Sequence, residues 1–142
     1  RAGGAAPVLL MTWARRARPT DQALLADAYD SIGRELGVTV SPAGLAWQEA
    51  RRQWPNLELH VADGSPPNPV GTYLAACVLY ATLTGHDPRG AAPRITGHPY
   101  SRVLQDVDRT TTVTLVGLDP TLARRLQALA WSVVRQRTIG KG

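Results

Sequence analysis

The distribution of hydrophobic and polar residues predicts short buried strands that alternate with amphipathic helices. An unbroken apolar run over residues 6–13 is typical of a strand buried on both faces, as in a parallel sheet. A second apolar run over 38–40 predicts another such strand. Over 110–116, threonines alternate with aliphatic residues, which predicts an edge strand or one arm of a hairpin. The segment 86–99 is rich in Gly, Pro and Arg and predicts a loop.

Four segments carry apolar residues at the spacing of an amphipathic helix. They cover residues 20 or 21 to 36, about 43–54, 69–84 and about 120–135. The first helix has one apolar face, formed by Leu25, Ala28, Ile32 and Leu36. We expect residues 137–142 to form a flexible tail.

The third of these helices has the clearest terminal signals. Asn68 is a good N-cap residue, because its side-chain oxygen can accept a hydrogen bond from a free N–H of the first turn. Pro69 follows at the first helical position, where its missing N–H costs nothing. Gly85 can adopt the left-handed conformation that ends a helix, as Gly37 can for the first helix. The pair Asp119-Pro120 repeats the N-terminal signal before the fourth helix.

Residues 62–76 resemble the last sequence block of the SGNH/GDSL hydrolases. In that family the block reads Asp-Gly-x-His-Pro, then a short polar turn, then Gly-x-Tyr-Leu-Ala-Ala at the start of a helix. The matching residues are Asp63, Gly64, Pro67, Gly71, Tyr73, Leu74, Ala75 and Ala76. The Asp and the His of the block belong to a Ser-His-Asp triad, so the resemblance implies that Asp63 occupies the position of the triad acid.

Pro66 departs from this block, because it occupies the position of the catalytic His. Proline has no side chain that can accept a proton, so it cannot be the base. His60 precedes Asp63 by three residues and is the alternative base that the sequence offers first. His86 and His98 are expected at the far end of the third helix and in the Gly- and Pro-rich loop. A hydrogen-bonded core or surface histidine is the simpler interpretation of all three.

The nucleophile of such a triad is missing from its expected place. In the family the Ser lies in a Gly-Asp-Ser motif after the first strand, and a Gly and an Asn complete the oxyanion hole. None of the serines here lies in a Gly-Asp-Ser or Gly-x-Ser-x-Gly motif. They are Ser31, Ser41, Ser65, Ser101 and Ser132. Asp63 also has a simpler interpretation, since Asp-Gly is a common turn dipeptide. Whether the chain is an enzyme therefore stays open.

The order strand, helix, strand, helix predicts an α/β layered structure with right-handed crossovers. Two parallel strands alone do not form a stable sheet with helices on both faces. The chain therefore either borrows strands from elsewhere or is part of a longer domain. The resemblance favours the second alternative and implies the C-terminal part of a flavodoxin-like, three-layer parallel-sheet domain of the SGNH type over residues 1–136.

Two functions follow from these observations. The first hypothesis, which the resemblance implies, is that the chain is the C-terminal portion of an esterase or acyl-hydrolase and is inactive as it stands, with a carboxylic ester such as an acylated carbohydrate as the ligand. Alternatively, it is a non-catalytic pseudoenzyme or partner-binding module. In that case a protein partner or a second copy would cover the exposed edge of the sheet.

The net charge and the single cysteine bear on whether the chain binds nucleic acid or uses a reactive thiol. The net charge of +5 comes from arginines scattered over the predicted helices, which indicates a solvated surface, and we do not expect nucleic acid as a partner. Salt-dependent binding to unrelated DNA sequences would contradict that expectation. Cys77, the only cysteine, lies among the apolar positions of the third helix and is expected to pack as a small hydrophobic residue.

Cofactor and membrane signals are missing from the sequence. No zinc-type cysteine cluster, phosphate-binding Gly loop or dinucleotide motif is present, so we expect neither a cofactor nor a metal. No signal peptide or transmembrane segment is visible in the given residues, and we expect no membrane partner. The sequence does not indicate a cellular compartment.

Overall fold

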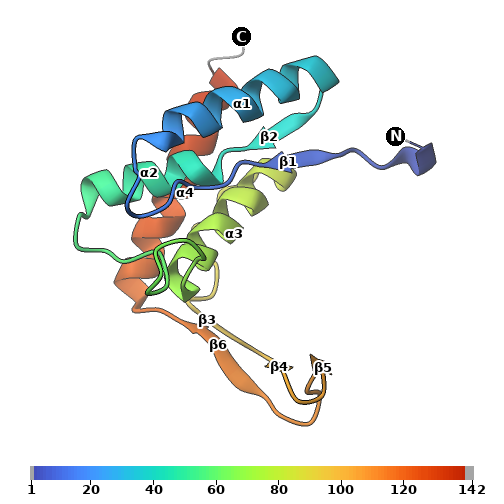
Figure 1. The fold of residues 1–142 in the computed structure, drawn as a ribbon, viewed down its shortest axis with the longest axis vertical. Helices are drawn as coiled ribbons and strands as arrows, with labels where there is room; N and C mark the ends of the chain where they lie inside the picture. The colour runs from blue at the N-terminus through green and yellow to red at the C-terminus, as the bar shows by residue number, and fades with distance from the viewer. Residues whose placement is uncertain (1, 140–142) are drawn as a thin grey trace.

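The computed structural model describes residues 2–139. These residues form a mixed α/β unit with four α-helices and three two-stranded sheets (Figure 1). The α-helices are α1 (Asp21–Leu36), α2 (Ala43–Gln53), α3 (Pro69–Thr84) and α4 (Pro120–Ile139), after a 3₁₀ helix, η1 (Ala2–Gly4). The strands are β1 (Val8–Leu10), β2 (Thr39–Ser41), β3 (Arg94–Gly97), β4 (Tyr100–Ser101), β5 (Asp106–Val107) and β6 (Val113–Gly117).

The two apolar runs predicted as strands pair with each other in parallel. Val8 lies opposite Thr39 and Leu10 lies opposite Ser41, with α1 as the connection between the two strands. Beyond β1 the chain stays attached to this layer, because Met11 donates a backbone hydrogen bond to the carbonyl of Ser41 (2.9 Å). The predicted order of strand, helix and strand is therefore confirmed, although both strands are only three residues long.

The core lies where α2, α3 and α4 pack together (Figure 1). Trp47 of α2, Leu74 of α3 and Leu126 of α4 are almost fully buried in it. The apolar stripe predicted on the third helix faces this core, with Cys77 and Val78 both buried. Burial raises the pKa of the Cys77 thiol to about 11. Among the described residues, no helix is long and apolar enough to cross a membrane.

The helix ends follow the predicted capping chemistry. The Asn68 side chain accepts a hydrogen bond from the backbone N–H of Gly71 (2.9 Å), and Gly85 ends α3 with a left-handed φ of 69°. The carboxylate of Asp119 accepts hydrogen bonds from the first-turn N–H groups of Thr121 and Leu122, at 2.9 and 3.1 Å. Local signals of this kind fix where α3 and α4 begin.

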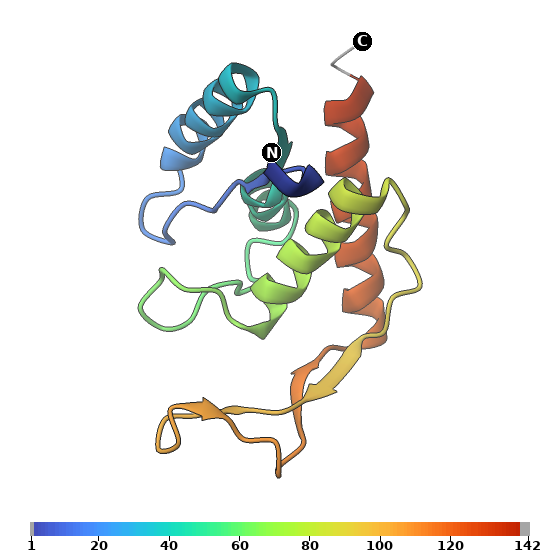
Figure 2. The ribbon, with the colours of Figure 1, turned by 90° about the vertical axis from the view of Figure 1, so that its right-hand side faces the viewer.

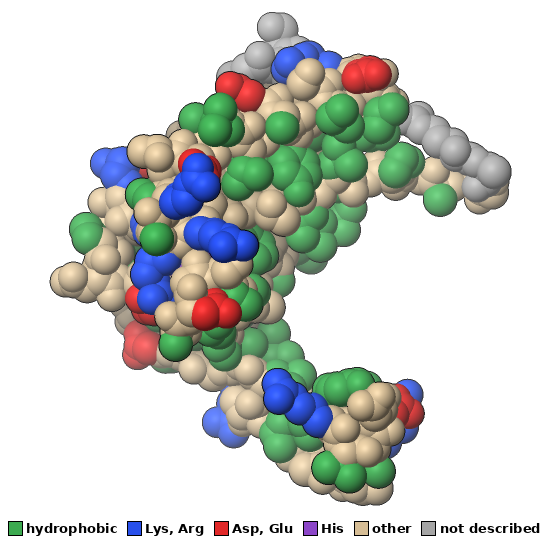
Figure 3. Space-filling model, in the orientation of Figure 1, with side chains coloured by type: hydrophobic (Ala, Val, Ile, Leu, Met, Phe, Trp, Pro, Cys, Tyr) green, Lys and Arg blue, Asp and Glu red, His purple; other side chains and the backbone are tan. Residues whose placement is uncertain are grey.

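The face of α1 that was predicted to be apolar is largely exposed. Ile32 is 45% exposed and Leu36 is 59% exposed. The buried residues of α1 are instead Gln22 and Gly33. Gln22 ties the helix to the segment after β1, because its side chain accepts a hydrogen bond from the Ala14 N–H (2.8 Å) and donates one to the Thr12 carbonyl (3.2 Å). Hydrophobic side chains gather on the surface over α1 and β1, as the space-filling view shows (Figure 3).

Residues 93–118 form an arm that extends away from the helices (Figure 2). In this arm β3 pairs with β6 in antiparallel fashion, and β4 pairs with β5 nearer the tip. The strand predicted over 110–116, as an edge strand or one arm of a hairpin, is confirmed as β6, which is displaced slightly toward the C-terminus. The loop predicted over 86–99 is wrong over residues 94–97, which form β3, because pairing with β6 supplies order that the Gly- and Pro-rich sequence does not indicate.

The fourth helix continues beyond its predicted end near Arg135. It extends to Ile139, so residues 137–139 of the predicted tail are helical, and residues 140–142 lie outside the described residues. Arg137 forms an ion pair with Asp30 of α1, which holds this last turn against another helix. The prediction missed this turn because an ion pair between distant helices leaves no local sequence signal.

A buried amide links α4 to the segment that follows α3. Gln127 is 1% exposed, and its side-chain oxygen accepts a hydrogen bond from the Gly90 N–H (3.1 Å). Its nitrogen donates to the Tyr73 hydroxyl (2.8 Å) and to the Ala91 carbonyl (3.0 Å). The Tyr73 hydroxyl in turn donates to the carbonyl of Ala92 (3.0 Å). One side chain thus fixes the chain where it enters the arm.

Candidate functional site

The segment with the SGNH-like sequence is a narrow loop in front of α3. His60 and Pro67 form an isolated antiparallel bridge at its base. The Val61 N–H donates to the Pro66 carbonyl (3.0 Å), and the Gly64 N–H donates to the Val61 carbonyl (2.9 Å). These bonds close a turn over residues 61–66, which we call the Asp63 loop.

Asp63 lies at the exposed tip of this loop. Its Oδ1 atom accepts a hydrogen bond from the Ser65 N–H (2.9 Å), and Gly64 between them has a φ of 75°. This is the Asx-type turn that an Asp-Gly pair favours. The carboxylate therefore stabilises the loop in this structure, and its role as a triad acid stays a prediction.

Pro66, which stands where the sequence resemblance implies a His, has an exposed side chain. Its carbonyl oxygen contributes to the loop through the bond from Val61. The loop thus keeps a closed conformation without an imidazole beside Asp63. The Pro66 side chain offers no group that could accept a proton from a nucleophile.

Arg16 holds the Asp63 loop to the segment after β1. Its guanidinium donates hydrogen bonds to three consecutive carbonyl groups, those of His60 (3.5 Å), Val61 (2.7 Å) and Ala62 (3.3 Å). It also forms a salt bridge with Glu58 (3.2 Å), and its backbone N–H donates to the Gly64 carbonyl (2.9 Å). The sequence analysis missed this residue, because a basic loop shows no periodicity that singles out one arginine.

We expect Arg16→Ala to loosen the Asp63 loop while the helical core stays folded. Loss of several charge-assisted bonds at a partly exposed site should cost about 1 kcal/mol of unfolding free energy. Amide hydrogen exchange should accelerate over residues 61–65 and stay unchanged in α3 and α4. The exposed neighbour Arg15 provides the control, since Arg15→Ala should leave exchange in the loop as it is. Equal exchange in both variants would contradict the assigned role of Arg16.

His60 lies beneath the loop and is 2% exposed. Its Nε2 is 3.0 Å from the carbonyl oxygen of Ala14, an acceptor, so Nε2 carries the proton and donates. Its Nδ1 is buried and has no hydrogen-bond partner in the described part of the chain; it lies 3.8 Å from a carboxylate oxygen of Glu58. The ring meets Trp47 edge-on, with centroids 4.9 Å apart. His60 is thus held in the core, and its service as an alternative base stays a prediction.

Two other sequence candidates have structural partners. Ser65, the serine closest to Asp63 in sequence, uses its backbone: its carbonyl accepts a hydrogen bond from Trp13 Nε1 (3.3 Å). Ser41 is fully buried beside Thr82, whose hydroxyl lies 3.2 Å from that of Ser41. Within residues 2–139, no group of three or more His, Cys, Asp or Glu side chains could hold a metal ion.

The fold is similar to part of one solved structure. The crystal structure of a DUF4886 family protein from Bacteroides uniformis matches 94% of this chain with a TM-score of 0.66 and 19% sequence identity. The match covers 49% of that protein, so this chain spans about half its length. No protein-family model and no curated protein sequence matches the chain. The comparison therefore shows a shared α/β fold over one part of a larger protein.

Proposed function

We propose that the chain is the C-terminal part of an SGNH hydrolase-like α/β domain whose hydrolytic site lacks its base. The observation that carries this proposal is the Asp63 loop, which precedes α3 and is bound by Arg16 to the segment that follows β1. A carboxylate on a loop at the carboxyl end of a parallel strand is where α/β proteins place their chemistry. The fold match supports the proposal, because DUF4886 proteins are SGNH-hydrolase-like.

The uncovered sheet supports a larger domain. In the described residues β1 pairs with β2 alone, so the other edge of β1 has free backbone groups. On α1, Ile32 and Leu36 are exposed, and on α3, Leu83 is 59% exposed. Apolar surface beside an unpaired strand edge is what further strands and helices of a three-layer sheet would cover. In the proposed domain, the remaining strands pair with β1.

The intact hydrolase would act on a carboxylic ester such as an acylated carbohydrate by Ser-His-Asp chemistry. Such chemistry needs a nucleophile, a base that takes its proton and a carboxylate that orients the base. Only the carboxylate position, Asp63, is filled here. We therefore infer that the chain alone does not hydrolyse esters.

The alternative function is a non-catalytic module that keeps the scaffold for binding. The bonds around Arg16 favour this alternative, since they order the Asp63 loop without a catalytic His. In this case the partner, or a second copy of the chain, covers the β1 edge. The two functions differ in whether ester hydrolysis appears when a His replaces Pro66.

Ester hydrolysis by the purified chain and by a Pro66→His variant tests the proposal. We expect both proteins to be inert toward a short-chain activated ester, because no serine occupies the nucleophile position. Activity in the Pro66→His variant alone would instead reveal a nucleophile and make loss of the base the only defect. Activity in the parent chain that Asp63→Ala abolishes would overturn the proposal. His60→Gln would then show whether His60 is the base.

A further inference from the structure

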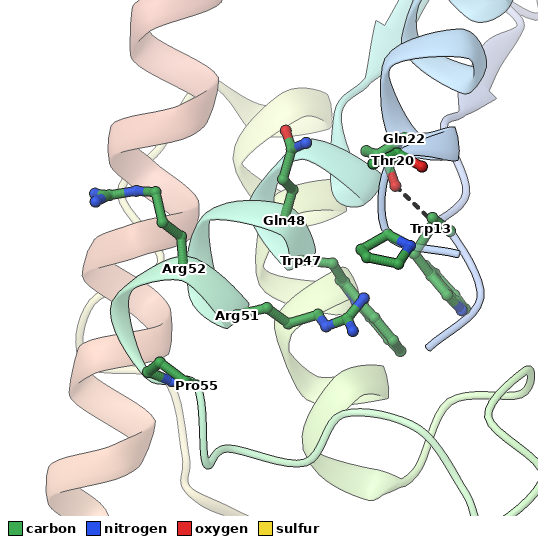
Figure 4. Close-up of a pocket in the computed structure, with 10 residues that line it drawn as sticks. Trp13, Thr20, Gln22, Trp47, Gln48, Arg51, Arg52 and Pro55 are labelled. Atoms are coloured by element: carbon green, nitrogen blue, oxygen red, sulfur yellow. Dashed lines mark hydrogen bonds between the residues drawn. The ribbon is translucent and has the colours of Figure 1, made fainter. Parts of the chain in front are cut away.

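A cavity of about 500 Å³ lies between the segment after β1 and helix α2 (Figure 4). Its apolar walls come from two tryptophans and two prolines, namely Trp13, Trp47, Pro19 and Pro55. Its polar lining includes Gln48, Arg51 and Arg52 of α2. This volume lies within the range of pockets that hold small organic ligands. The cavity is distinct from the exposed tip of the Asp63 loop.

Arg51 brings an uncompensated positive charge to this cavity. Its side chain is half-buried, and its one hydrogen bond among the described residues goes from Nη2 to the Arg16 carbonyl (3.1 Å). The next residue, Arg52, is by contrast paired with Glu49 through two bonds, of 2.9 and 2.6 Å. In the close-up, Arg51 extends beside Trp47 while Arg52 points the other way (Figure 4). No Asp or Glu lines the cavity to neutralise Arg51.

A stacked pair of tryptophans forms the apolar wall of the cavity. Trp13 stacks on Trp47 with ring centroids 4.2 Å apart and planes 7° from parallel. Trp47 is 1% exposed, and its indole Nε1 has no hydrogen-bond partner among the described residues. That nitrogen is not accessible from the cavity, so the half-buried Trp13 provides the planar apolar wall that a ligand could contact.

We propose that this cavity binds a small aromatic carboxylate. Its carboxylate pairs with the Arg51 guanidinium, whose planar fork of N–H donors matches two carboxylate oxygens. Because one unpaired cation lines the site, a ligand with one negative charge matches it better than a doubly charged phosphate does. The aromatic ring lies against Trp13 and the prolines Pro19 and Pro55. This inference does not depend on the proposed hydrolase ancestry.

Titration of tryptophan fluorescence with benzoate, at fixed ionic strength, tests the proposal. We expect a saturable change in the parent chain and at least a tenfold weaker affinity in Arg51→Gln. Arg109→Gln is the matched control, because Arg109 is exposed in the arm and does not line the cavity, so this variant should bind benzoate within twofold of the parent. Benzamide, which keeps the ring but lacks the charge, should bind at least tenfold more weakly than benzoate.

Arg51 also donates a hydrogen bond to the Arg16 carbonyl. The Arg51→Gln substitution could therefore weaken benzoate binding by disturbing the local structure. An Arg51→Lys variant keeps the charge and loses the fork, so its affinity should fall between those of the parent and Arg51→Gln. Thermal unfolding of all three proteins separates folding from binding. The proposal is overturned by a parent chain that shows no saturation up to about 10 mM benzoate. Equal binding of benzoate by Arg51→Gln, or of benzamide by the parent, would overturn it as well.

Discussion

Gly71→Ala is expected to destabilise the protein by about 2–4 kcal/mol, although alanine is the better helix former. A Cβ atom at Gly71 would lie 2.3 Å from the carbonyl oxygen of Leu59 and 2.4 Å from Cζ2 of Trp47. Both neighbours are fixed, because the Leu59 carbonyl accepts the Asn68 N–H (2.9 Å) and Trp47 is packed in the core. The added methyl group therefore has to push α3 away from α2.

Urea unfolding of the variant measures this loss of stability directly. Thr72→Ala is the control, since Thr72 is exposed on the same turn of α3 and its replacement should change the unfolding free energy by no more than about 0.5 kcal/mol. If Gly71→Ala were as stable as the parent, the close approach of α3 to Trp47 would be wrong. The glycine of the Gly-x-Tyr-Leu sequence is therefore explained by packing.

Gln127→Leu is expected to cost about 2–3 kcal/mol, although leucine has a similar size and is more hydrophobic. The substitution removes the acceptor for the Gly90 N–H and the donor to the Ala91 carbonyl and the Tyr73 hydroxyl. The chain before the arm would lose its attachment to α4. Hydrogen exchange should therefore accelerate at Gly90, whose amide donates to Gln127.

The exposed Gln136 of the same helix gives the matched control for this substitution. Gln136→Leu should leave both the unfolding free energy and the exchange near Gly90 within error of the parent. Unchanged stability in Gln127→Leu would mean that the buried amide contributes no more than a leucine in its place. Comparing the two leucine variants removes the general effect of added hydrophobicity.

The parts of the fold that sequence could predict are those with local signals. The Asn68 cap, the Asp119 cap and the left-handed Gly85 each depend on groups within a few residues, and all three are confirmed. The parallel pairing of β1 and β2 also followed from the order of the elements. Strand β3 could not be found in this way, because its order comes from pairing with β6, some twenty residues later.

The sequence predicted where the candidate site lies along the chain. It did not predict the contacts that hold the site in place. A short block of sequence around Asp63 pointed to the loop, and the N-cap placed the loop directly before α3. Arg16 lies more than forty residues away, so its bonds to the loop carbonyls depend on how β1 and α3 pack together. The burial of His60 against Trp47 likewise depends on α2.

The single thiol of the chain offers a way to time the opening of α3. Cys77 is 5% exposed, and burial raises its pKa to about 11, so at neutral pH the folded protein holds almost no thiolate there. We therefore expect a thiol reagent to modify the chain when the packing around α3 opens and admits solvent. The labelling rate then reports the frequency of that event, with no fluorophore or engineered cysteine required.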